Sequence, residues 1–356
     1  MNYKKTFAIE GRKIGSKYPP YVIAEMSANH NGDIENAYKI IAMAKRAGAD
    51  AVKMQTYTAD TITLDAHTSD FMIEGGLWHG QRLYDLYQNA HTPWEWHQPL
   101  FEYARQQGIT IFSSPFDNTA VDLLEDLNAP AYKIASFEAI DLPLIKYVAQ
   151  TGKPMIISTG MANQTEIAEA IEAAHEGGCT ELAILHCVSG YPAPAEDYNL
   201  RVLSDMQTRF NLPVGLSDHT LDNTTAITSI ALGACIVEKH VTLDRNGGGP
   251  DDTFSLEELD LKALCRGVKT AWNALGSVDY GRKSSEQGNL KFRRSLYFVK
   301  DIQAGEVITA EHIKSIRPGY GIAPKYLEKI VGQVAPEAIQ RGTAVHSHWL
   351  GVLNGL

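Results

Sequence analysis

Short apolar segments rich in Val, Ile and Ala recur eight times in the first 285 residues of the chain. Runs of this length without polar alternation are typical of strands that are buried on both faces of a parallel sheet. We therefore predict one strand at each run. The runs are Tyr21–Ala24, Ala51–Met54, Ile109–Phe112, Ala131–Ile134, Met155–Ile157, Leu182–Leu185, Val214–Leu216 and Cys235–Val237.

Longer stretches between these runs carry apolar residues at helical spacing. Asp141 followed by Pro143 marks one helix start, since Asp is a common N-cap and Pro is tolerated in the first turn. Eight strands that alternate with helices within about 250 residues predict a (β/α)8 TIM barrel, an α/β fold. The alternative, an open doubly wound sheet, would place a Gly-rich phosphate turn after the first strand, where the chain has EMSANHNG. Helical stretches lie at 34–47, 93–107, 120–127, 164–176 and 225–233, and glycines at 48, 108, 152 and 233 stand where helices should end.

The connection between the second and third predicted strands is unusually long and contains an insert at 56–90. Loops that follow barrel strands lie on the catalytic face, so we predict that this insert forms part of a substrate pocket. An insertion without a functional role is the alternative. Its apolar side chains beside the pocket mouth would be Phe71, Met72, Leu77 and Trp78.

The character of the sequence changes near residue 285, where segments become short and strand-like. GRKSSEQG at 281–288 has the composition of a linker. IQAGEVI at 302–308 resembles IQRGTAV at 339–345, and a Gly between β-branched residues predicts two similar hairpins. We predict a catalytic barrel domain at 1–284 and a small β-rich domain at 285–356. The small core of the second domain would lean on the barrel or on another subunit.

The charge balance argues against several classes of partner. The 356 residues include 32 Lys and Arg against 42 Asp and Glu, a net charge of −10, whereas nucleic-acid binding needs a basic surface. No apolar run reaches the roughly 18 residues of a membrane span, and the start, MNYKK, shows no signal peptide. The four cysteines are isolated, as in a protein with reduced thiols. We expect a cytoplasmic enzyme that binds neither nucleic acid nor membrane.

Polar residues follow all eight predicted strands, at the end of the barrel where active sites of this fold lie. Lys53 and Lys133 have no acidic run beside them, so each needs an anionic partner. A substrate phosphate and carboxylate would supply it. The alternative is a structural Lys–Glu pair inside the barrel, with Glu138 or Glu25 as the acid. Hydroxyls for the substrate cradle would come from Ser136, Ser158, Ser189 and Ser217.

Two histidines, His219 and His240, follow the last two predicted strands. Neighbouring strands lie ~4.8 Å apart, so both imidazoles can reach one metal ion. Two nitrogen ligands leave positions open for water or substrate oxygen, which suits an exchangeable Mn²⁺-type Lewis acid better than structural zinc. The alternative is that both are capping or acid–base histidines.

Ten short motifs stand at these predicted strand ends and in the tail. In chain order they are EMSANHNG at 25–32, KMQ at 53–55, SPF at 114–116, KIASFE at 133–138, STG at 158–160, HC at 186–187, YP at 191–192, GLSDH at 215–219, EKH at 238–240 and RPG at 317–319. The set resembles the sialic acid synthase family over nearly the whole chain, and RPG resembles the antifreeze-like (SAF) domain of that family. The resemblance implies a TIM barrel followed by a small SAF domain.

Within the family, three features resemble the branch that makes pseudaminic acid. They are GGLW at 75–78 followed by LY and TP, SANH at 27–30 where sialic acid synthases usually have Ile-Asn-His, and Phe137 where those enzymes tend to have Gly. Ser189 also departs from the Asn that is common in sialic acid synthases. The implied reaction condenses phosphoenolpyruvate with 2,4-diacetamido-2,4,6-trideoxy-L-altrose and releases phosphate by C–O cleavage. Synthesis of N-acetylneuraminic or legionaminic acid is the alternative.

The resemblance also implies roles for individual residues. Glu25 would orient or deprotonate the water that adds at carbon 2, or relay its proton. Phosphoenolpyruvate would bind Lys53, Lys133, Ser136, Ser158, Ser189 and Ser217. A divalent metal, Mn²⁺ in first place with Mg²⁺ or Co²⁺ as alternatives, would bind His219 and His240. The sugar would contact Gln55, Glu138, Tyr191, Asp251 and Arg317, the last from the partner's small domain in a domain-swapped homodimer.

Two other functions stay open at this point. A metal-dependent sugar aldolase or isomerase could use the same histidines and carboxylates, but it would release no phosphate from phosphoenolpyruvate. A carbohydrate-binding or antifreeze-type module could explain the tail. Such a module would not need two lysines and two histidines at strand ends.

Overall fold

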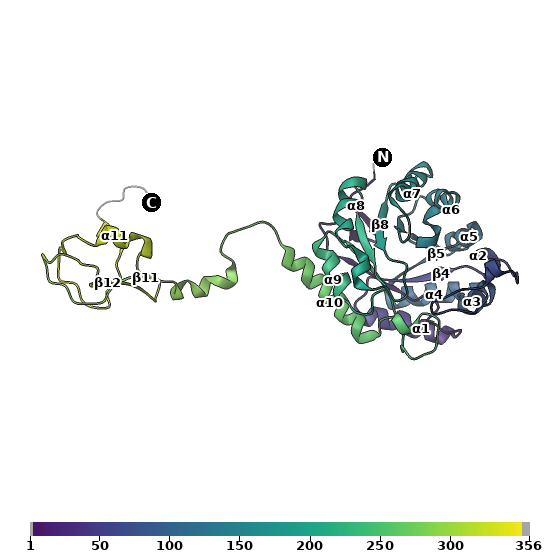
Figure 1. The fold of residues 1–356 in the computed structure, drawn as a ribbon, viewed down its shortest axis with the longest axis horizontal. Helices are drawn as coiled ribbons and strands as arrows, with labels where there is room; N and C mark the ends of the chain where they lie inside the picture. The colour runs from purple at the N-terminus through teal and green to yellow at the C-terminus, as the bar shows by residue number, and fades with distance from the viewer. Residues whose placement is uncertain (1–2, 351–356) are drawn as a thin grey trace. The chain divides into compact units, whose positions relative to one another are not determined.

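The computed structural model describes residues 3–350, and the first part of the chain forms a closed barrel of eight parallel strands (Figure 1). A strand occurs at each of the eight predicted runs, so the prediction of a TIM barrel is confirmed. The last barrel strand closes the barrel by pairing with the first. The barrel strands are β3 (Tyr21–Glu25), β4 (Ala51–Thr56), β5 (Thr110–Pro115), β6 (Tyr132–Ile134), β7 (Met155–Ser158), β8 (Leu182–Cys187), β9 (Val214–Ser217) and β10 (Ile236–His240).

Helices form a ring outside these strands (Figure 1). Asp141 caps one of them, because its Oδ1 accepts a hydrogen bond of 3.1 Å from the N–H of Leu144. Gly48 and Gly108 end two others with positive φ angles of 95° and 66°, as predicted. No helix in residues 3–350 combines the length and the hydrophobicity that crossing a bilayer requires. The outer helices are α1 (Ile34–Ala47), α4 (Trp94–Gln107), α5 (Asn118–Asp126), α6 (Leu142–Ala149), α7 (Gln164–Glu176), α8 (Val202–Phe210), α9 (Thr224–Ala231) and α10 (Glu258–Leu275).

A short hairpin packs on the amino-terminal end of the barrel. Its strands, β1 (Phe7–Ile9) and β2 (Arg12–Ile14), are antiparallel. Apolar side chains of the hairpin form one buried cluster with side chains from the barrel strands, including Tyr21, Ala51 and Phe112. Because this end is filled with apolar groups, a polar site is left to the carboxyl ends of the strands.

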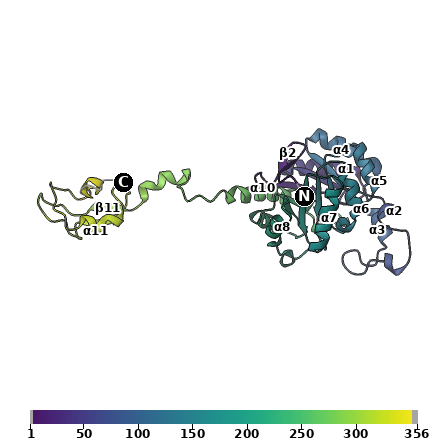
Figure 2. The same ribbon diagram turned by 90° about the horizontal axis from the view of Figure 1, so that it is seen from above.

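Short helices and loops follow the strands at the carboxyl end of the barrel. The insert at 56–90 carries α2 (Ala59–Ile62), the 3-10 helix η1 (Ser69–Phe71) and α3 (Leu83–Ala90). Its loop extends beside α2 and α3 (Figure 2). Three further 3-10 helices follow β6, β8 and β10, and they are η2 (Ser136–Ile140), η3 (Ala195–Tyr198) and η4 (Asp252–Phe254).

The described residues divide between Gly276 and Ser277 into two compact units. The second unit has its own buried core, which includes Leu296, Phe298 and Ile313. The domain boundary between residues 284 and 285 remains a prediction. The elements of this unit are η5 (Ser284–Phe292), the antiparallel strands β11 (Ser295–Phe298) and β12 (Ile313–Ile316), η6 (Pro324–Tyr326), α11 (Leu327–Ile330) and η7 (Ser347–Leu350).

The two similar Gly-containing segments of the second unit form equivalent turns but not two separate hairpins. Gly305 and Gly342 have φ angles of 85° and 89°, which favour glycine in both turns. Ile302 and Ile339 pair with each other through two main-chain hydrogen bonds of 2.9 Å. The prediction of two hairpins is therefore wrong. The segments pair with each other at Ile302 and Ile339, whereas Gly305 donates to Ala335 and Gly342 donates to Phe298, both of which lie outside the two segments.

Candidate active site

Charged side chains from the ends of four barrel strands are buried inside the barrel. Glu25 comes from β3, Lys53 from β4, Lys133 from β6 and Glu238 from β10, and none is more than 4% exposed. The register pairs Glu25 with Lys53 across neighbouring strands. In a closed barrel, inward-pointing residues at one level of the strands face a shared interior. The four groups therefore form one charged cluster.

Glu238 is the centre of this cluster. Its Oε1 lies 3.3 Å from the Nζ of Lys133 and 3.4 Å from the Nζ of Lys53. Lys53 Nζ also lies 3.0 Å from Glu25 Oε2. Two carboxylates thus face two ammonium groups, although no acidic run stands beside either lysine in the sequence. Of the acids proposed as alternative partners, Glu25 forms an ion pair with Lys53.

Burial and neighbouring charges set the protonation of the cluster. Burial raises the pKa of Glu25 and lowers the pKa of Lys133. Burial also acts against the charge on Lys53, but the negative charges of Glu238 and Glu25 outweigh it and raise the pKa of Lys53. Lys133 and Lys53 likewise outweigh the effect of burial on Glu238 and lower its pKa. Within the cluster, Glu25 is thus the carboxyl group that binds a proton more readily.

Serine hydroxyls lie at the carboxyl ends of the strands, and one of them contacts the charged cluster. Ser217 Oγ lies 3.4 Å from Glu238 Oε1, whereas Ser158 Oγ is buried with no hydrogen-bond partner in the described part of the chain. Ser136 Oγ accepts a hydrogen bond of 3.2 Å from the N–H of Gly160. A Cβ on Gly160 would collide with the hydroxyls of both Ser136 and Ser189, so these two side chains converge on the same glycine. All four predicted serines therefore lie at the carboxyl ends of the strands. Ser217 lies beside Glu238, and Ser136 and Ser189 lie beside Gly160.

His219 and His240 lie next to each other, with their ring centroids 5.3 Å apart. The Nδ1–H of His219 donates to the carbonyl oxygen of Val188 at 2.8 Å, so in the neutral ring Nε2 keeps a lone pair. The Nδ1 of His240 is buried and has no hydrogen-bond partner within residues 3–350. The ring of Tyr191 packs on His219 at 4.5 Å between centroids and lies 6.2 Å from His240.

These two imidazoles fit a metal ion that takes its other ligands from water or substrate. A fixed Nδ1–H tautomer that leaves Nε2 free is the usual state of a metal-binding histidine. Residues 3–350 contain no group of three or more His, Cys, Asp or Glu arranged to hold a metal. The donor set thus suits the exchangeable ion that the sequence predicts, and it does not suit a closed structural zinc site.

Polar side chains beside the histidines are linked by hydrogen bonds. Gln55 Nε2 donates to Glu25 Oε1 at 2.9 Å and to Ser27 Oγ at 3.0 Å. Ser27 in turn donates to Asp251 Oδ2, which lies 3.7 Å from His240 Nδ1. A chain of polar groups therefore connects the charged cluster to the histidines, and it contains two of the predicted sugar-binding residues.

Glu138 follows β6 on η2, and its Oε2 is buried with no hydrogen-bond partner among residues 3–350. Burial raises the pKa of this carboxyl group to about 7. An oxygen of this kind can accept a hydrogen bond from a bound hydroxyl or amide. The role of Glu138 in binding the sugar remains a prediction.

Trp78 of the insert contacts the site. Its ring centroid lies 6.0 Å from that of Tyr191, and its indole N–H donates to the carbonyl oxygen of Pro250 at 3.3 Å. Met72 and Leu77 are exposed, by 37% and 50%. Trp78 is therefore the one of the four predicted apolar side chains with a described contact to a site residue.

Arg317 belongs to the second unit and follows β12. It lines a hollow of about 520 Å³ together with Phe292, Arg293 and Arg294. This surface is basic and suits a polar or anionic group. Contact of Arg317 with the sugar remains a prediction.

Sequence reasoning placed Asp218, Glu238 and Lys239 at the ends of predicted strands but gave them no role, and it gave none to Ser27. Glu238 stands two residues before His240, and alternate residues of a strand share a face. That spacing could have placed Glu238 in the site. No comparable spacing predicts the buried ion pair of Lys239 with Asp218, which joins a strand to the loop after its neighbour.

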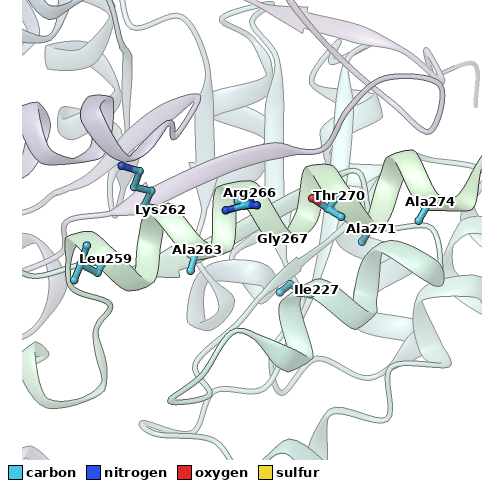
Figure 3. A pocket seen from close by; sticks show the side chains of 9 residues that line it. All are labelled: Ile227, Leu259, Lys262, Ala263, Arg266, Gly267, Thr270, Ala271 and Ala274. Carbon is cyan, nitrogen blue, oxygen red and sulfur yellow. The ribbon is translucent and has the colours of Figure 1, made fainter.

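A second hollow, of about 630 Å³, lies outside the barrel between α9 and α10 (Figure 3). Its lining includes Ile227, Leu259 and Arg266. None of the predicted site residues, all of which the structure describes, lines it. The polar site at the strand ends is therefore separate from this hollow.

Comparisons with known proteins agree with this arrangement. A model of the NeuB family matches residues 40–280, and a model of the SAF domain matches residues 293–347. The chain is 42% identical to a pseudaminic acid synthase of Campylobacter jejuni, over 91% of this chain and 95% of the relative. It is 37% identical to an N,N'-diacetyllegionaminic acid synthase of the same species, over 88% of this chain and 95% of the relative.

One solved structure is similar over both chains. It is an N-acetylneuraminic acid (sialic acid) synthetase from Leptospira borgpetersenii in complex with citrate. The TM-score is 0.72 at 28% identity, and the match covers 81% of this chain and 96% of the other.

Proposed function

The chain belongs to the NeuB family, and from this premise we propose that it condenses phosphoenolpyruvate with 2,4-diacetamido-2,4,6-trideoxy-L-altrose to give pseudaminic acid and phosphate. It would thus be a transferase that forms a C–C bond. Carbon 3 of phosphoenolpyruvate attacks the sugar aldehyde, water adds at carbon 2, and phosphate leaves when the bond from carbon 2 to its oxygen breaks. The identity of 42% to a pseudaminic acid synthase, against 37% to a legionaminic acid synthase, favours the altrose substrate.

The observation that carries the proposal is the pair of buried lysines among serine hydroxyls at the strand ends. Lys53 and Lys133 each form an ion pair with Glu238. The Ser158 hydroxyl has no hydrogen-bond partner in the described structure and is available to a ligand. Charge-assisted hydrogen bonds from an ammonium group and from hydroxyls suit the phosphate and the carboxylate of phosphoenolpyruvate. The four serines, Ser136, Ser158, Ser189 and Ser217, would complete this cradle.

Glu25 is the candidate for handling the attacking water. Its Oε1 accepts from Gln55, while its Oε2 faces Lys53. Burial raises its pKa, so it can take up and release a proton more readily than an exposed carboxylate. Glu25 would orient or deprotonate the water, or relay the proton that the water loses.

His219 and His240 would hold a divalent metal, with Mn²⁺ in first place and Mg²⁺ or Co²⁺ as alternatives. When bound there, the metal would supply a Lewis acid for the sugar aldehyde. The protein's own contribution is to fix the His219 ring through Val188 and to enclose both rings with Tyr191. The His219 imidazole is thus oriented before substrate binds.

The sugar would be bound on the side of the histidines and the insert. Glu138 offers a buried oxygen without a partner, and Asp251 is tied to Gln55 through Ser27. Tyr191 and Trp78 supply an aromatic wall. Arg317 would add a contact to an acetamido group from the small domain of the partner subunit, in a domain-swapped homodimer.

Mixing two inactive variants tests the proposed exchange of domains. Arg317→Ala lacks the tail contact and His219→Ala lacks a metal ligand. If each site combines a barrel with the partner's tail, mixed dimers regain one complete site and recover activity. If mixing restores nothing although the subunits exchange, Arg317 does not act on the partner's site.

We place the protein in the cytoplasm. All four cysteines are free in the described residues, three of them buried, which agrees with a reducing compartment. Phosphoenolpyruvate is also an intracellular metabolite. Fractionation of producing cells tests this placement.

Phosphate release is the experiment that tests the proposed reaction. The purified protein is given phosphoenolpyruvate, Mn²⁺ and a panel of amino sugars, and inorganic phosphate is measured. We expect release only with the diacetamido trideoxy sugar, in step with formation of a nine-carbon keto acid. Sugar cleavage without phosphate release would identify an aldolase, and sugar binding without turnover would identify a binding module.

A further inference from the structure

A buried lysine outside the proposed substrate cradle holds the loop that carries His219. The Nζ of Lys239 lies 3.0 Å from Asp218 Oδ2, and these side chains are 1% and 0% exposed. The same ammonium group donates to the carbonyl oxygens of Thr220 at 2.6 Å and Asp222 at 2.9 Å. These three acceptors belong to Asp218, Thr220 and Asp222, on both sides of His219 in the sequence.

Lys239 also stands between two site residues on β10. Alternate residues of a strand point to opposite faces, so Glu238 and His240 share one face and Lys239 takes the other. Main-chain bonds strengthen this link, because the N–H of Asp218 donates to the carbonyl oxygen of Glu238 at 2.9 Å. The loop after β9 is therefore hydrogen-bonded to β10, the strand that contains His240.

Other hydrogen bonds also restrain His219. Its main-chain N–H donates to the hydroxyl of Tyr198 at 2.7 Å, its carbonyl oxygen accepts from the N–H of Ala193 at 3.1 Å, and its ring donates to Val188. None of these bonds fixes the carbonyl groups of the residues that follow His219.

The ammonium group of Lys239 binds two of those carbonyl groups, at Thr220 and Asp222. The Asp222 carbonyl oxygen also accepts from the Thr220 hydroxyl at 3.1 Å.

We propose that Lys239 is a positioning residue that fixes His219 relative to His240 for binding of the divalent metal. Groups that orient metal-binding histidines typically contribute 10–100-fold to metal affinity. The inference rests on the proposed function, because it takes both histidines as ligands. Lys239 itself touches neither substrate nor metal.

The test compares Mn²⁺ binding in variants with matched charge. Lys239→Met alone leaves the buried Asp218 carboxylate unpaired and can unfold the loop. The double variant Lys239→Met/Asp218→Asn removes both charges, and the Asn oxygen can still accept from Thr220. The control is Arg12→Met/Asp50→Asn, which removes an ion pair of 2.8 Å involving the β1–β2 hairpin at the opposite end of the barrel.

Two affinities are measured on each full-length protein, that for Mn²⁺ alone by electron paramagnetic resonance and that for phosphoenolpyruvate in the presence of a chelator. We expect the Lys239→Met/Asp218→Asn variant to bind Mn²⁺ at least tenfold more weakly while phosphoenolpyruvate affinity changes less than twofold. The control pair should keep both affinities.

Three outcomes would overturn the inference, and they are distinguishable. Unchanged Mn²⁺ affinity in the double variant shows that Lys239 does not position His219. Parallel loss of both affinities shows a general structural role. Failure of the wild-type protein to bind Mn²⁺ removes the metal from the proposed function, and this inference with it.

Discussion

Lys53 and Glu25 form an ion pair of 3.0 Å at the carboxyl ends of neighbouring strands, with side chains only 4% and 1% exposed. Lys53 is shared with Glu238 at 3.4 Å. An anionic substrate that binds Lys53 must therefore compete with two carboxylates, Glu25 and Glu238, for the ammonium group of Lys53. The two lysines thus act both in substrate binding and in compensating buried negative charge.

Lys53→Met and Lys133→Met should each weaken phosphoenolpyruvate binding by at least tenfold. A charge-assisted hydrogen bond contributes ~1.5–3 kcal/mol, and about 1.4 kcal/mol corresponds to a factor of ten. Titration calorimetry measures this affinity. The exposed Lys39→Met is the control, and unchanged affinity in both site variants would contradict the substrate cradle.

Lys53→Met should also lower the free energy of unfolding more than Lys133→Met does. Lys53 is paired with Glu25 and Glu238, whereas Lys133 is paired with Glu238 alone. Breaking a buried ion pair by removing one partner typically costs ~3–5 kcal/mol. Urea unfolding at neutral pH measures the difference, and equal stability of the two variants would argue against the shared role of Lys53.

Gly160→Ala should reduce phosphoenolpyruvate affinity without unfolding the barrel. The added methyl group would displace the hydroxyls of Ser136 and Ser189, which can move by rotating about χ1, and it would push the Cβ of Ser136 by a few tenths of an ångström. Loss of one hydroxyl contact to an anion predicts a decrease of about tenfold. Gly288→Ala is the matched control, because a Cβ there meets nothing within 4 Å. An unaltered affinity in Gly160→Ala would remove the two serines from the cradle.

Replacement of His219 or His240 by Ala should abolish metal-dependent turnover while the barrel stays folded. Their imidazoles lie 5.3 Å apart between centroids, and a change to Ala leaves the main-chain pairing of His240 with Glu25 in place. Circular dichroism checks the fold and phosphate release checks activity. His175→Ala, on the exposed side of α7, should remain active. Full activity of the wild-type protein after treatment with a chelator would contradict the Lewis-acid role.

The barrel could be predicted from the sequence because each strand contains one short run in which apolar residues predominate. Strand order and polarity then follow from the fold, so the polar residues after each run are brought to one end. This reasoning located Lys53, Lys133, His219 and His240. The same reasoning applies to any residue that lies in a strand or directly after one.

Other parts of the site depend on contacts that no local pattern encodes. Glu238 meets Lys53 and Lys133 only because the closed barrel brings β10 close to β4 and β6 across its interior. In the insert, the conformation of an irregular loop determines which apolar side chains are buried. Trp78 contacts Tyr191, whereas the neighbouring Leu77 is half exposed. Sequence spacing carries neither kind of information.

Because of Glu138, the free energy of unfolding should fall as the pH rises from about 4.5 to about 7. Burial raises its pKa from 4.5 to about 7, so in this range the folded protein holds a proton that the unfolded chain has released. Between pH 5.5 and 8.5 the wild type should lose ~1–2 kcal/mol relative to Glu138→Gln, which cannot ionise. Urea unfolding of both proteins at the two pH values measures this. A stability difference that does not change with pH would show that Glu138 is ionised in the folded protein throughout.

Trp78 should contribute to the choice of sugar. The diacetamido trideoxy sugar has a methyl group at carbon 6 where N-acetylmannosamine has a hydroxymethyl group. Burying a hydroxyl without a partner costs ~1–3 kcal/mol, so an apolar wall at this point favours the methyl group. An apolar pocket rejects an added hydroxyl only moderately, and discrimination of about a hundredfold is the most that this effect can supply. Further selectivity must come from hydrogen bonds to the second acetamido group, for which Glu138 and Arg317 are the candidates.

The measurement is kcat/KM for both sugars, at fixed Mn²⁺ and phosphoenolpyruvate, in the wild type and in Trp78→Ala. We expect Trp78→Ala to narrow the preference for the diacetamido sugar by about tenfold, because it removes the ring that packs on Tyr191 and its bond to Pro250. Leu77→Ala, at the neighbouring and half-exposed position, should leave the preference unchanged. Equal narrowing in both variants would show that the insert acts through its backbone rather than through Trp78. Equal or better turnover of N-acetylmannosamine by the wild type would assign the chain to the sialic acid branch and remove the proposed role of the insert.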